Sequence, residues 1–167
     1  MVVDEQSFIA MYDEFAPKIF KYCYFRVSSR EIAEDLSAQA FAKAWDYIAQ
    51  GKSIDNVQAF LYRIAHNQVI DHYRKGKESK EISLDDEKRP IDIVDGTDFV
   101  ESLDIERTLE SVKQKLDLLP ENYREIITLR YVNDLAMKDI ASAMGVSENN
   151  ASVLLHRATT KLKNLLQ

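Results

Sequence analysis

Residues that break helices or cross-link loops are scarce in this sequence. Its 167 residues include only 4 glycines, 3 prolines and one cysteine. A lone cysteine excludes an internal disulfide, and we expect Cys23 to be a buried, reduced thiol. No apolar run approaches the roughly 20 residues that a membrane-spanning helix needs, and the N-terminus lacks the charged, then apolar pattern of a signal peptide. We therefore expect a cytoplasmic protein without membrane insertion.

Apolar residues recur at the three-to-four-residue spacing of amphipathic helices. They make up 46% of the chain, enough for real cores, and the 30% of charged residues favours a soluble protein. The pattern predicts an all-α fold. Ser29 and either Asp55 or Asn56 are expected to cap the helices that follow them. The first predicted helix spans residues 6–15, is interrupted at Pro17 and is followed by a second helix that begins after this proline. Further helices are predicted at residues 31–45, 57–75, 105–119, 120–132, 137–144 and 147–166.

The net charge of −6 is unevenly distributed. Residues 81–106 hold ten acids against two bases, whereas residues 57–80 hold two acids against five bases and residues 107–167 seven against nine. An acidic chain can therefore still carry two mildly basic, nucleic-acid-facing segments. The acid-rich stretch at 81–104, with one proline, one glycine and no sustained periodicity, predicts a flexible linker. We expect two small helical domains, 1–80 and 105–167, joined by that acidic linker.

Residues 119–166 have the spacing of a helix-turn-helix. Small Ala141 permits a close helix crossing, Gly145 suits the sharp turn, and Ser147 can cap the following helix. A plain three-helix bundle is the alternative interpretation. In a helix-turn-helix the last helix reads DNA, with Arg157, Lys161 and Lys163 within reach of phosphates. Its groove-facing residues are predicted to be Glu148, Asn149, Asn150, Ser152, Val153 and His156.

The predicted helix at 57–75 carries a polar stripe. A solvated face stabilised by pairs four residues apart would explain such a stripe. The cationic end of the helix and two nearby tyrosines favour nucleic acid instead, because aromatic rings stack on bases and cations hold phosphates. The stripe consists of Arg63, Asn67, Asp71 and Arg74. The cations at the end of the helix are Arg74, Lys75, Lys77 and Lys80, and the two tyrosines are Tyr62 and Tyr73.

Three longer motifs follow one another along the chain. The first runs from Ala33-Glu-Asp-Leu36 through Phe41-Ala-Lys-Ala-Trp45. The second is Phe60-Leu-Tyr-Arg-Ile-Ala-His-Asn67, followed by Asp71, His72 and Arg74. The third combines Leu119-Pro120, Arg124-Glu125, Leu129-Arg-Tyr131, Ile140-Ala141, Gly145 and His156-Arg-Ala158. In this order the three motifs resemble those of the bacterial sigma-70 family, the promoter-recognition subunits of RNA polymerase, in its group 4 or extracytoplasmic-function (ECF) type.

The resemblance implies a region 2 bundle in 1–80 that binds core polymerase and the −10 element, and a region 4 helix-turn-helix in 105–167 that binds the −35 element. Core polymerase, through its beta and beta-prime subunits, promoter DNA and an anti-sigma factor are the implied partners. Carried over by motif, the core-binding residues are Asp35, Leu36, Ser37, Gln39 and Lys43. The −10 residues are Lys52, Ser53, Asn56, Arg63, Asn67, Asp71, Arg74 and Lys75, and the −35 residues are the groove-facing set with Arg157 and Lys161.

The sequence departs from the family pattern at several positions. Phe60 replaces the usual tryptophan, and Ser152 and Leu154 replace two frequent cations of the recognition helix. Fewer cations should weaken phosphate binding and lower its salt dependence. Asparagine amides at Asn149 and Asn150 can still bond adenine in the major groove.

Two other functions stay open at this stage. The small number of cations on the recognition helix would suit a module that titrates polymerase or a regulator without productive promoter contact. The other alternative is an ordinary helix-turn-helix repressor, which would bind its operator without polymerase. An enzyme is disfavoured, since His66, Asp71 and His72 do not share one helical face. No metal-ligand spacing or glycine-rich phosphate loop occurs, so we expect no catalytic residue, metal or cofactor.

Overall fold

Helices account for the regular structure throughout the part of the chain described by the computed structural model, residues 4–27, 29–80 and 110–166, and no strand occurs there. The predicted all-α class is confirmed. The linker at 81–104 lies outside these residues, and the domain boundaries stay a prediction. None of the helices described is long and apolar enough to cross a membrane. The elements are α1 (Glu5–Val27), α2 (Arg30–Ala49), α3 (Val57–Lys80), a helical segment at 110–116, α5 (Glu121–Ile127), the π-helical turn η1 (Thr128–Val132), α6 (Met137–Met144) and α7 (Glu148–Leu166).

Helix α1 continues through Pro17, so the predicted break there is wrong. Proline removes one backbone donor, which leaves the carbonyl of Asp13 without its helical partner. Asp13 and Pro17 are both exposed, so water can satisfy that carbonyl. The neighbouring Phe15 and Ile19 are buried and hold the two halves of the helix on one core. Packing therefore outweighs the local effect of the proline.

The predicted caps of α2 and α3 are confirmed. The Ser29 hydroxyl accepts a hydrogen bond from the backbone N–H of Ile32 at 3.3 Å, and the Asn56 side chain accepts one from that of Ala59 at 3.0 Å. Each bond satisfies a backbone donor that has no partner within the first helical turn. Helix α3 extends five residues beyond its predicted end at Lys75, to Lys80.

The turn chemistry of the C-terminal helices is also as predicted. Gly145 ends α6 in the left-handed conformation, at φ 73°. The Ser147 hydroxyl accepts a hydrogen bond from the backbone N–H of Asn150 at 3.0 Å, which caps α7. Asp134 turns the chain at φ 58° just after η1. Helices α5, α6 and α7 thus form the expected helix-turn-helix with its preceding helix.

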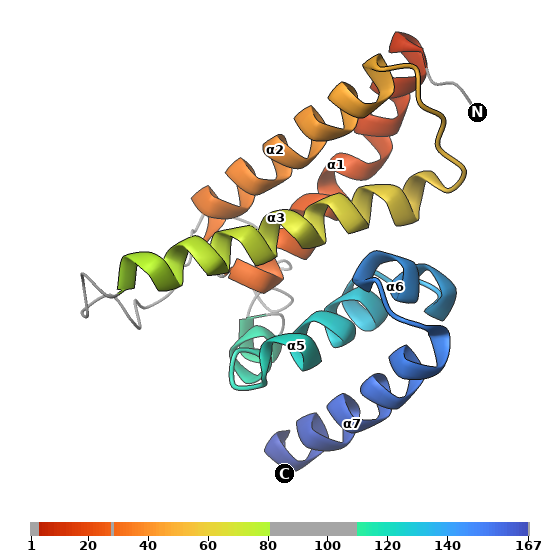
Figure 1. Cartoon of the computed structure of the whole chain (residues 1–167). Helices are drawn as coiled ribbons and strands as arrows, with labels where there is room; N and C mark the ends of the chain where they lie inside the picture. The colour runs from red at the N-terminus through yellow and green to blue at the C-terminus, as the bar shows by residue number, and fades with distance from the viewer. Residues whose placement is uncertain (1–3, 28, 81–109, 167) are drawn as a thin grey trace, which may run out of the picture.

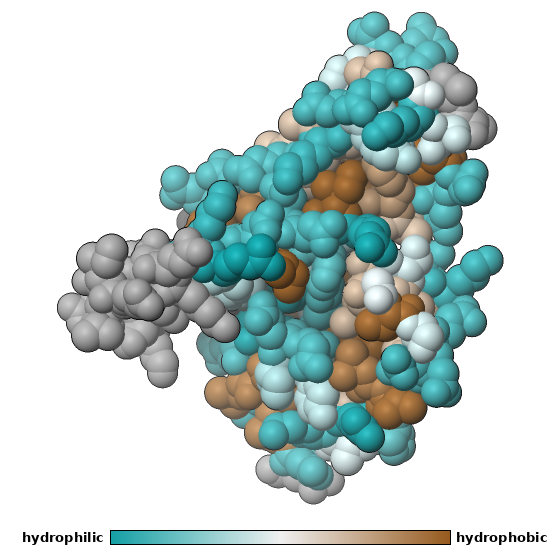
Figure 2. Space-filling model, in the orientation of Figure 1, coloured by the Kyte–Doolittle hydropathy of each residue, from teal (hydrophilic) through white to brown (hydrophobic). Residues whose placement is uncertain are grey.

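Helices α5, α6 and α7 pack against the bundle of α1, α2 and α3, an arrangement that the sequence patterns do not predict. Figure 1 shows α3 lying between α1 and α2 on one side and α5 and α6 on the other. Helix α3 contacts α6, and α1 contacts η1. One core of buried residues includes members of both groups, among them Ile19 and Leu61 with Leu129 and Ile140. On the face in Figure 2, hydrophilic side chains cover most of the surface and hydrophobic ones form smaller groups between them.

Cys23 is fully buried in α1 and has no disulfide partner, as expected. Burial raises the pKa of its thiol to about 12. Since only the thiolate reacts with alkylating agents, we expect iodoacetamide at pH 8 to modify Cys23 at least ~100-fold more slowly in the folded protein than in urea. Mass spectrometry of timed samples measures both rates. Similar rates in the two conditions would show that Cys23 is accessible in the folded chain.

Candidate nucleic-acid interface

The predicted −10 residues lie together on the loop before α3 and on α3 itself. All are exposed except Asp71, which is partly buried. The ammonium group of Lys52 lies 5.0 Å from the centre of the Tyr47 ring, and buried Ile54 fixes the loop to the core. Arg74 and Asp71 form an ion pair at 3.6 Å on the surface. Seven of the eight predicted −10 side chains are therefore open to solvent.

Two of these side chains already have partners in α6. The Asn56 amide donates a hydrogen bond to the Asp139 carboxylate at 2.8 Å, and the Arg63 guanidinium donates one to the backbone carbonyl of Ser142 at 3.0 Å. Gln58 donates a third bond, to the other Asp139 oxygen, at 3.3 Å. Helix α6 thus already bonds to Asn56 and Arg63, two of the eight predicted −10 residues.

The two tyrosines expected to stack on bases are not available for stacking. Tyr62 is 1% exposed, and its hydroxyl accepts a hydrogen bond from Asn133 at 3.1 Å. Tyr73 is partly buried and donates a hydrogen bond to the backbone carbonyl of Arg26. Both positions face the core or the C-terminal helices, because helical spacing places them off the polar stripe. The aromatic part of the stripe prediction is wrong.

The predicted recognition helix α7 presents all eight of its predicted −35 side chains to solvent. The small side chains of Ala151 and Ala158, on the other side of the same helix, are buried. Leu154 is partly buried against the core, which explains a leucine where the family often has a cation. Ser152 is exposed, so a serine in place of the usual cation there means one surface charge fewer.

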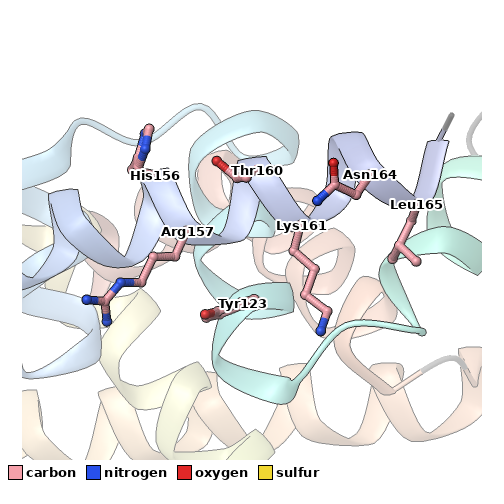
Figure 3. A pocket seen from close by; sticks show the side chains of 7 residues that line it. All are labelled: Tyr123, His156, Arg157, Thr160, Lys161, Asn164 and Leu165. Carbon is pink, nitrogen blue, oxygen red and sulfur yellow. The ribbon is translucent and has the colours of Figure 1, made fainter.

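An open pocket of about 600 Å³ lies between α7 and α5. Figure 3 shows Arg157 and Lys161 extending from the same side of α7, with Tyr123 of α5 between them. Two cations flanking an aromatic ring on one face are suited to a phosphate backbone. The remaining lining residues are His156, Thr160, Asn164 and Leu165.

The predicted core-binding surface is smaller than the sequence suggested. Leu36 and Ser37 are 6% and 8% exposed, because they lie on the buried stripe of α2. Their side chains are therefore not part of a surface in this structure. Asp35, Gln39 and Lys43 are exposed. The Gln39 carbonyl oxygen accepts a hydrogen bond from Gln68 at 2.7 Å, which orients its side chain.

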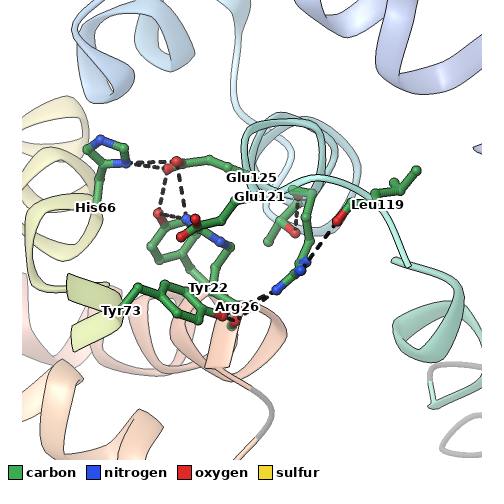
Figure 4. Close-up of polar contacts among 9 residues, drawn as sticks. Tyr22, Arg26, His66, Tyr73, Leu119, Glu121 and Glu125 are labelled. Carbon is green, nitrogen blue, oxygen red and sulfur yellow. Dashed lines mark hydrogen bonds and ion pairs between the residues drawn. The ribbon is translucent and has the colours of Figure 1, made fainter. Parts of the chain in front are cut away.

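A buried polar cluster, absent from the sequence-based prediction, joins α1 and α3 to α5. We call Tyr22, Arg26, His66 and Glu125 the Glu125 cluster (Figure 4). The Glu125 carboxylate lies 3.1 Å from Arg26, accepts a hydrogen bond of 2.5 Å from Tyr22, and lies 2.7 Å from Nδ1 of His66. An ionised carboxylate can only accept, so His66 donates from Nδ1. Residues 59 to 103 positions apart in sequence thus meet at one carboxylate.

The charges of the Glu125 cluster depend on one another. Burial by itself would raise the pKa of the Glu125 carboxyl, but the attraction of Arg26 and the bonds from His66 and Tyr22 outweigh it and lower that pKa. Burial by itself would lower the pKa of Arg26, whose neighbours Tyr22 and Glu125 raise it overall. The cluster therefore holds an ionised pair away from water, and each charge is stable only while its partner is present.

No group of three or more histidine, cysteine, aspartate or glutamate side chains in the described residues could hold a metal ion. The three histidines have separate surroundings. His66 belongs to the Glu125 cluster, partial burial lowers the pKa of His72, and His156 is exposed on α7. The arrangement offers polar and cationic binding surfaces on two separate groups of helices.

Comparison with known proteins identifies the family. The model of sigma-70 region 2 matches residues 11–79, and that of sigma-70 region 4 matches residues 109–162. The chain is 29% identical to the ECF RNA polymerase sigma factor SigW of Bacillus subtilis, over 98% of this chain and 91% of SigW. It is also 29% identical to SigM of that organism, another ECF RNA polymerase sigma factor, over 99% of this chain and 95% of SigM.

A solved structure shares the fold. The sigma factor RpoE of Bartonella quintana, crystallised with the anti-sigma factor NepR, superposes with a TM-score of 0.76 at 24% identity, covering 96% of this chain and 97% of RpoE. Regions 2 and 4 follow one another along this chain in the order that the sequence motifs predicted. The protein belongs to the sigma-70 family, in its ECF group.

Proposed function

We infer that this protein is an ECF sigma factor: it binds core RNA polymerase and directs transcription from specific promoters by recognising −10 and −35 elements. The observation that carries this inference is the presence of both sigma-70 regions, in order, on one chain. Transcription initiation, rather than catalysis of a reaction, is the activity of such a factor. Polymerase and DNA then place its site of action in the cytoplasm.

Each predicted surface has a role in this function. Asp35, Gln39 and Lys43 on α2 bind core polymerase, and the loop before α3 with the polar stripe binds the −10 element. The exposed first turns of α7 enter the major groove at −35, where the amides of Asn149 and Asn150 bond base edges. Arg157 and Lys161 bind phosphates alongside. Exposure of these side chains supports the assignment.

An anti-sigma factor is a further proposed partner. The support is that RpoE, which shares the fold of this chain, was crystallised with one. Binding of purified candidate proteins encoded beside this sigma factor can be measured by isothermal titration.

Run-off transcription tests the function directly. Core polymerase is incubated with genomic promoter fragments, with and without the purified chain. Transcripts with one defined start site that strictly require the chain support a sigma factor. A gel shift of free duplex without polymerase would instead favour a repressor, and polymerase binding without any transcript would favour a titrating module.

Reversing the charge of Arg74 is expected to impair initiation while sparing core binding. Arg74 is 69% exposed at the end of the polar stripe, where a glutamate would repel the DNA backbone. The R74E holoenzyme should give at least ~10-fold less run-off product. R74E should still comigrate with core polymerase in gel filtration. Lys21→Glu, an equal reversal at an exposed position of α1, is the control. Unchanged output from R74E would remove Arg74 from the −10 surface.

A further inference from the structure

Helix α3 supports the proposed core-binding surface of α2 with one buried amide. Gln68 is 4% exposed, and its Nε2 donates a hydrogen bond of 2.7 Å to the side-chain carbonyl oxygen of Gln39. The adjacent Val69 and Ala65, one turn earlier, are buried and apolar. A polar side chain at such a position costs free energy unless it is hydrogen-bonded. The bond to Gln39 therefore compensates for the burial of the Gln68 amide.

Gln39 lies in the middle of three exposed polar residues on one face of α2. Asp35 precedes it by four residues and Lys43 follows it by four, so neighbouring side chains are separated by about 6 Å along the helix. We call Asp35, Gln39 and Lys43 the α2 row. Asp35 offers hydrogen-bond acceptors and Lys43 offers donors, whereas the amide of Gln39 can offer either. The orientation of this amide decides what the centre of the row can bind.

The bond from Gln68 fixes that orientation. Because the oxygen of the Gln39 amide is held by Gln68, its NH2 group is directed away from α3. Gln39 is exposed, so this NH2 group is open to a binding partner. Restricting a glutamine side chain before binding also removes part of the entropy cost that association would otherwise carry. The centre of the α2 row is thus a preorganised donor.

We propose that Gln68 is a positioning residue for the binding of core polymerase. It holds Gln39 with its NH2 group outwards, and the polymerase group that meets Gln39 is a hydrogen-bond acceptor, either a carboxylate or a backbone carbonyl. Gln68 acts through Gln39, because its own side chain is almost completely buried. This inference rests on the proposed sigma-factor function.

Two substitutions at Gln39 test the direction of the amide. The full chain is titrated into fluorescently labelled core polymerase, and the dissociation constant is measured. Q39A removes the donor and should weaken binding about 5-fold, the typical effect of one hydrogen bond. Q39E keeps an oxygen that accepts from Gln68 but replaces the outward NH2 group with a second oxygen, so it should bind at least ~10-fold more weakly than wild type. Binding by Q39E as tight as by Q39A, or tighter, would overturn the inference.

The salt dependence of the Q39E effect distinguishes the two kinds of acceptor. Repulsion between two carboxylates is screened by salt, so the difference between Q39E and Q39A should shrink between low and moderate salt if polymerase presents a carboxylate. A difference that stays constant with salt indicates a backbone carbonyl.

A substitution at Gln68 tests the positioning role. Q68M removes the donor and keeps an unbranched side chain in the buried site, so Gln39 is no longer held and binding should weaken about 3-fold. In the Q39A background the same substitution should change the affinity by less than about 1.5-fold, since no amide is left to orient. A general defect in folding would act in both backgrounds. Equal losses in the two backgrounds would overturn the proposed role of Gln68.

Run-off transcription gives a second measure of the same step. Q68M should raise the sigma-factor concentration that gives half-maximal transcript by about 3-fold and leave the maximal transcript unchanged. Gln50→Ala, at the exposed glutamine that ends α2, is the control and should match wild type. A lower maximum with an unchanged half-maximal concentration would contradict a role in core binding. Wild-type chain that binds no core polymerase would instead refute the proposed function, so the two failures are distinguishable.

Discussion

Glutamine in place of Glu125 is expected to destabilise the folded chain by about 3 to 5 kcal/mol. Glu125 and Arg26 are 2% and 1% exposed, so the substitution leaves a buried guanidinium without its main counter-charge. Glu121 remains 3.5 Å from Arg26, but it is 40% exposed and its attraction is screened by water. The Tyr22 and His66 donors would also face a neutral amide in place of a carboxylate. A loss of this size is a large fraction of the roughly 5 to 15 kcal/mol that stabilises a typical domain.

Urea unfolding followed by far-UV circular dichroism measures the effect. A lower urea midpoint than that of wild type supports the role of the cluster. Glu14→Gln makes the same chemical change at an exposed position of α1 and should stay within about 0.5 kcal/mol of wild type. E125Q with wild-type stability would show that the buried pair does not stabilise the packing of α5 against α1 and α3.

A double substitution at Arg26 and Glu125 distinguishes the attraction between the two charges from the cost of burying them. Arg26→Met with Glu125→Leu removes the pair and fills the space with apolar side chains of similar length. Because the desolvation cost of both ions disappears together, the double variant should recover most of the stability that E125Q lacks. Recovery is measured in the same urea experiment. A double variant as unstable as E125Q would mean that the Tyr22 and His66 bonds matter more than the ion pair.

Features that depend on nearby residues could be predicted from the sequence. Ser29, Asn56 and Ser147 cap helices because each hydroxyl or amide bonds a backbone N–H three residues later. Gly145 ends α6 because glycine tolerates a positive φ without a steric penalty. The exposure of the recognition helix follows from its amphipathic spacing. All of these are properties of a few consecutive turns.

Features that depend on distant residues could not be predicted in this way. Pro17 signals a break locally, yet packing of its neighbours Phe15 and Ile19 carries the helix through it. Glu125 is one carboxylate in a helix rich in charged residues, and its partners lie 59 to 103 positions away. Leu36 and Ser37 belong to a family motif, but the motif does not say which side of α2 faces the core. Only the folded chain shows that α6 bonds to two of the residues proposed to bind DNA, Asn56 and Arg63.

Removing the two α7 cations that flank Tyr123 is expected to weaken promoter binding at −35 and to make it less sensitive to salt. Arg157 and Lys161 extend from one side of α7, and removal of each phosphate-binding cation should lower the slope of log K against log salt concentration by about 1. For R157Q/K161Q the slope should therefore fall by about 2, as measured by fluorescence anisotropy of holoenzyme on a mapped promoter between low and moderate salt. Lys21→Gln is the control, because Lys21 is an exposed cation on α1, outside region 4. Ser152 and Leu154 stand where the family often has cations, so few other charges on this helix can compensate. An unchanged slope would place the phosphate-binding residues of region 4 elsewhere.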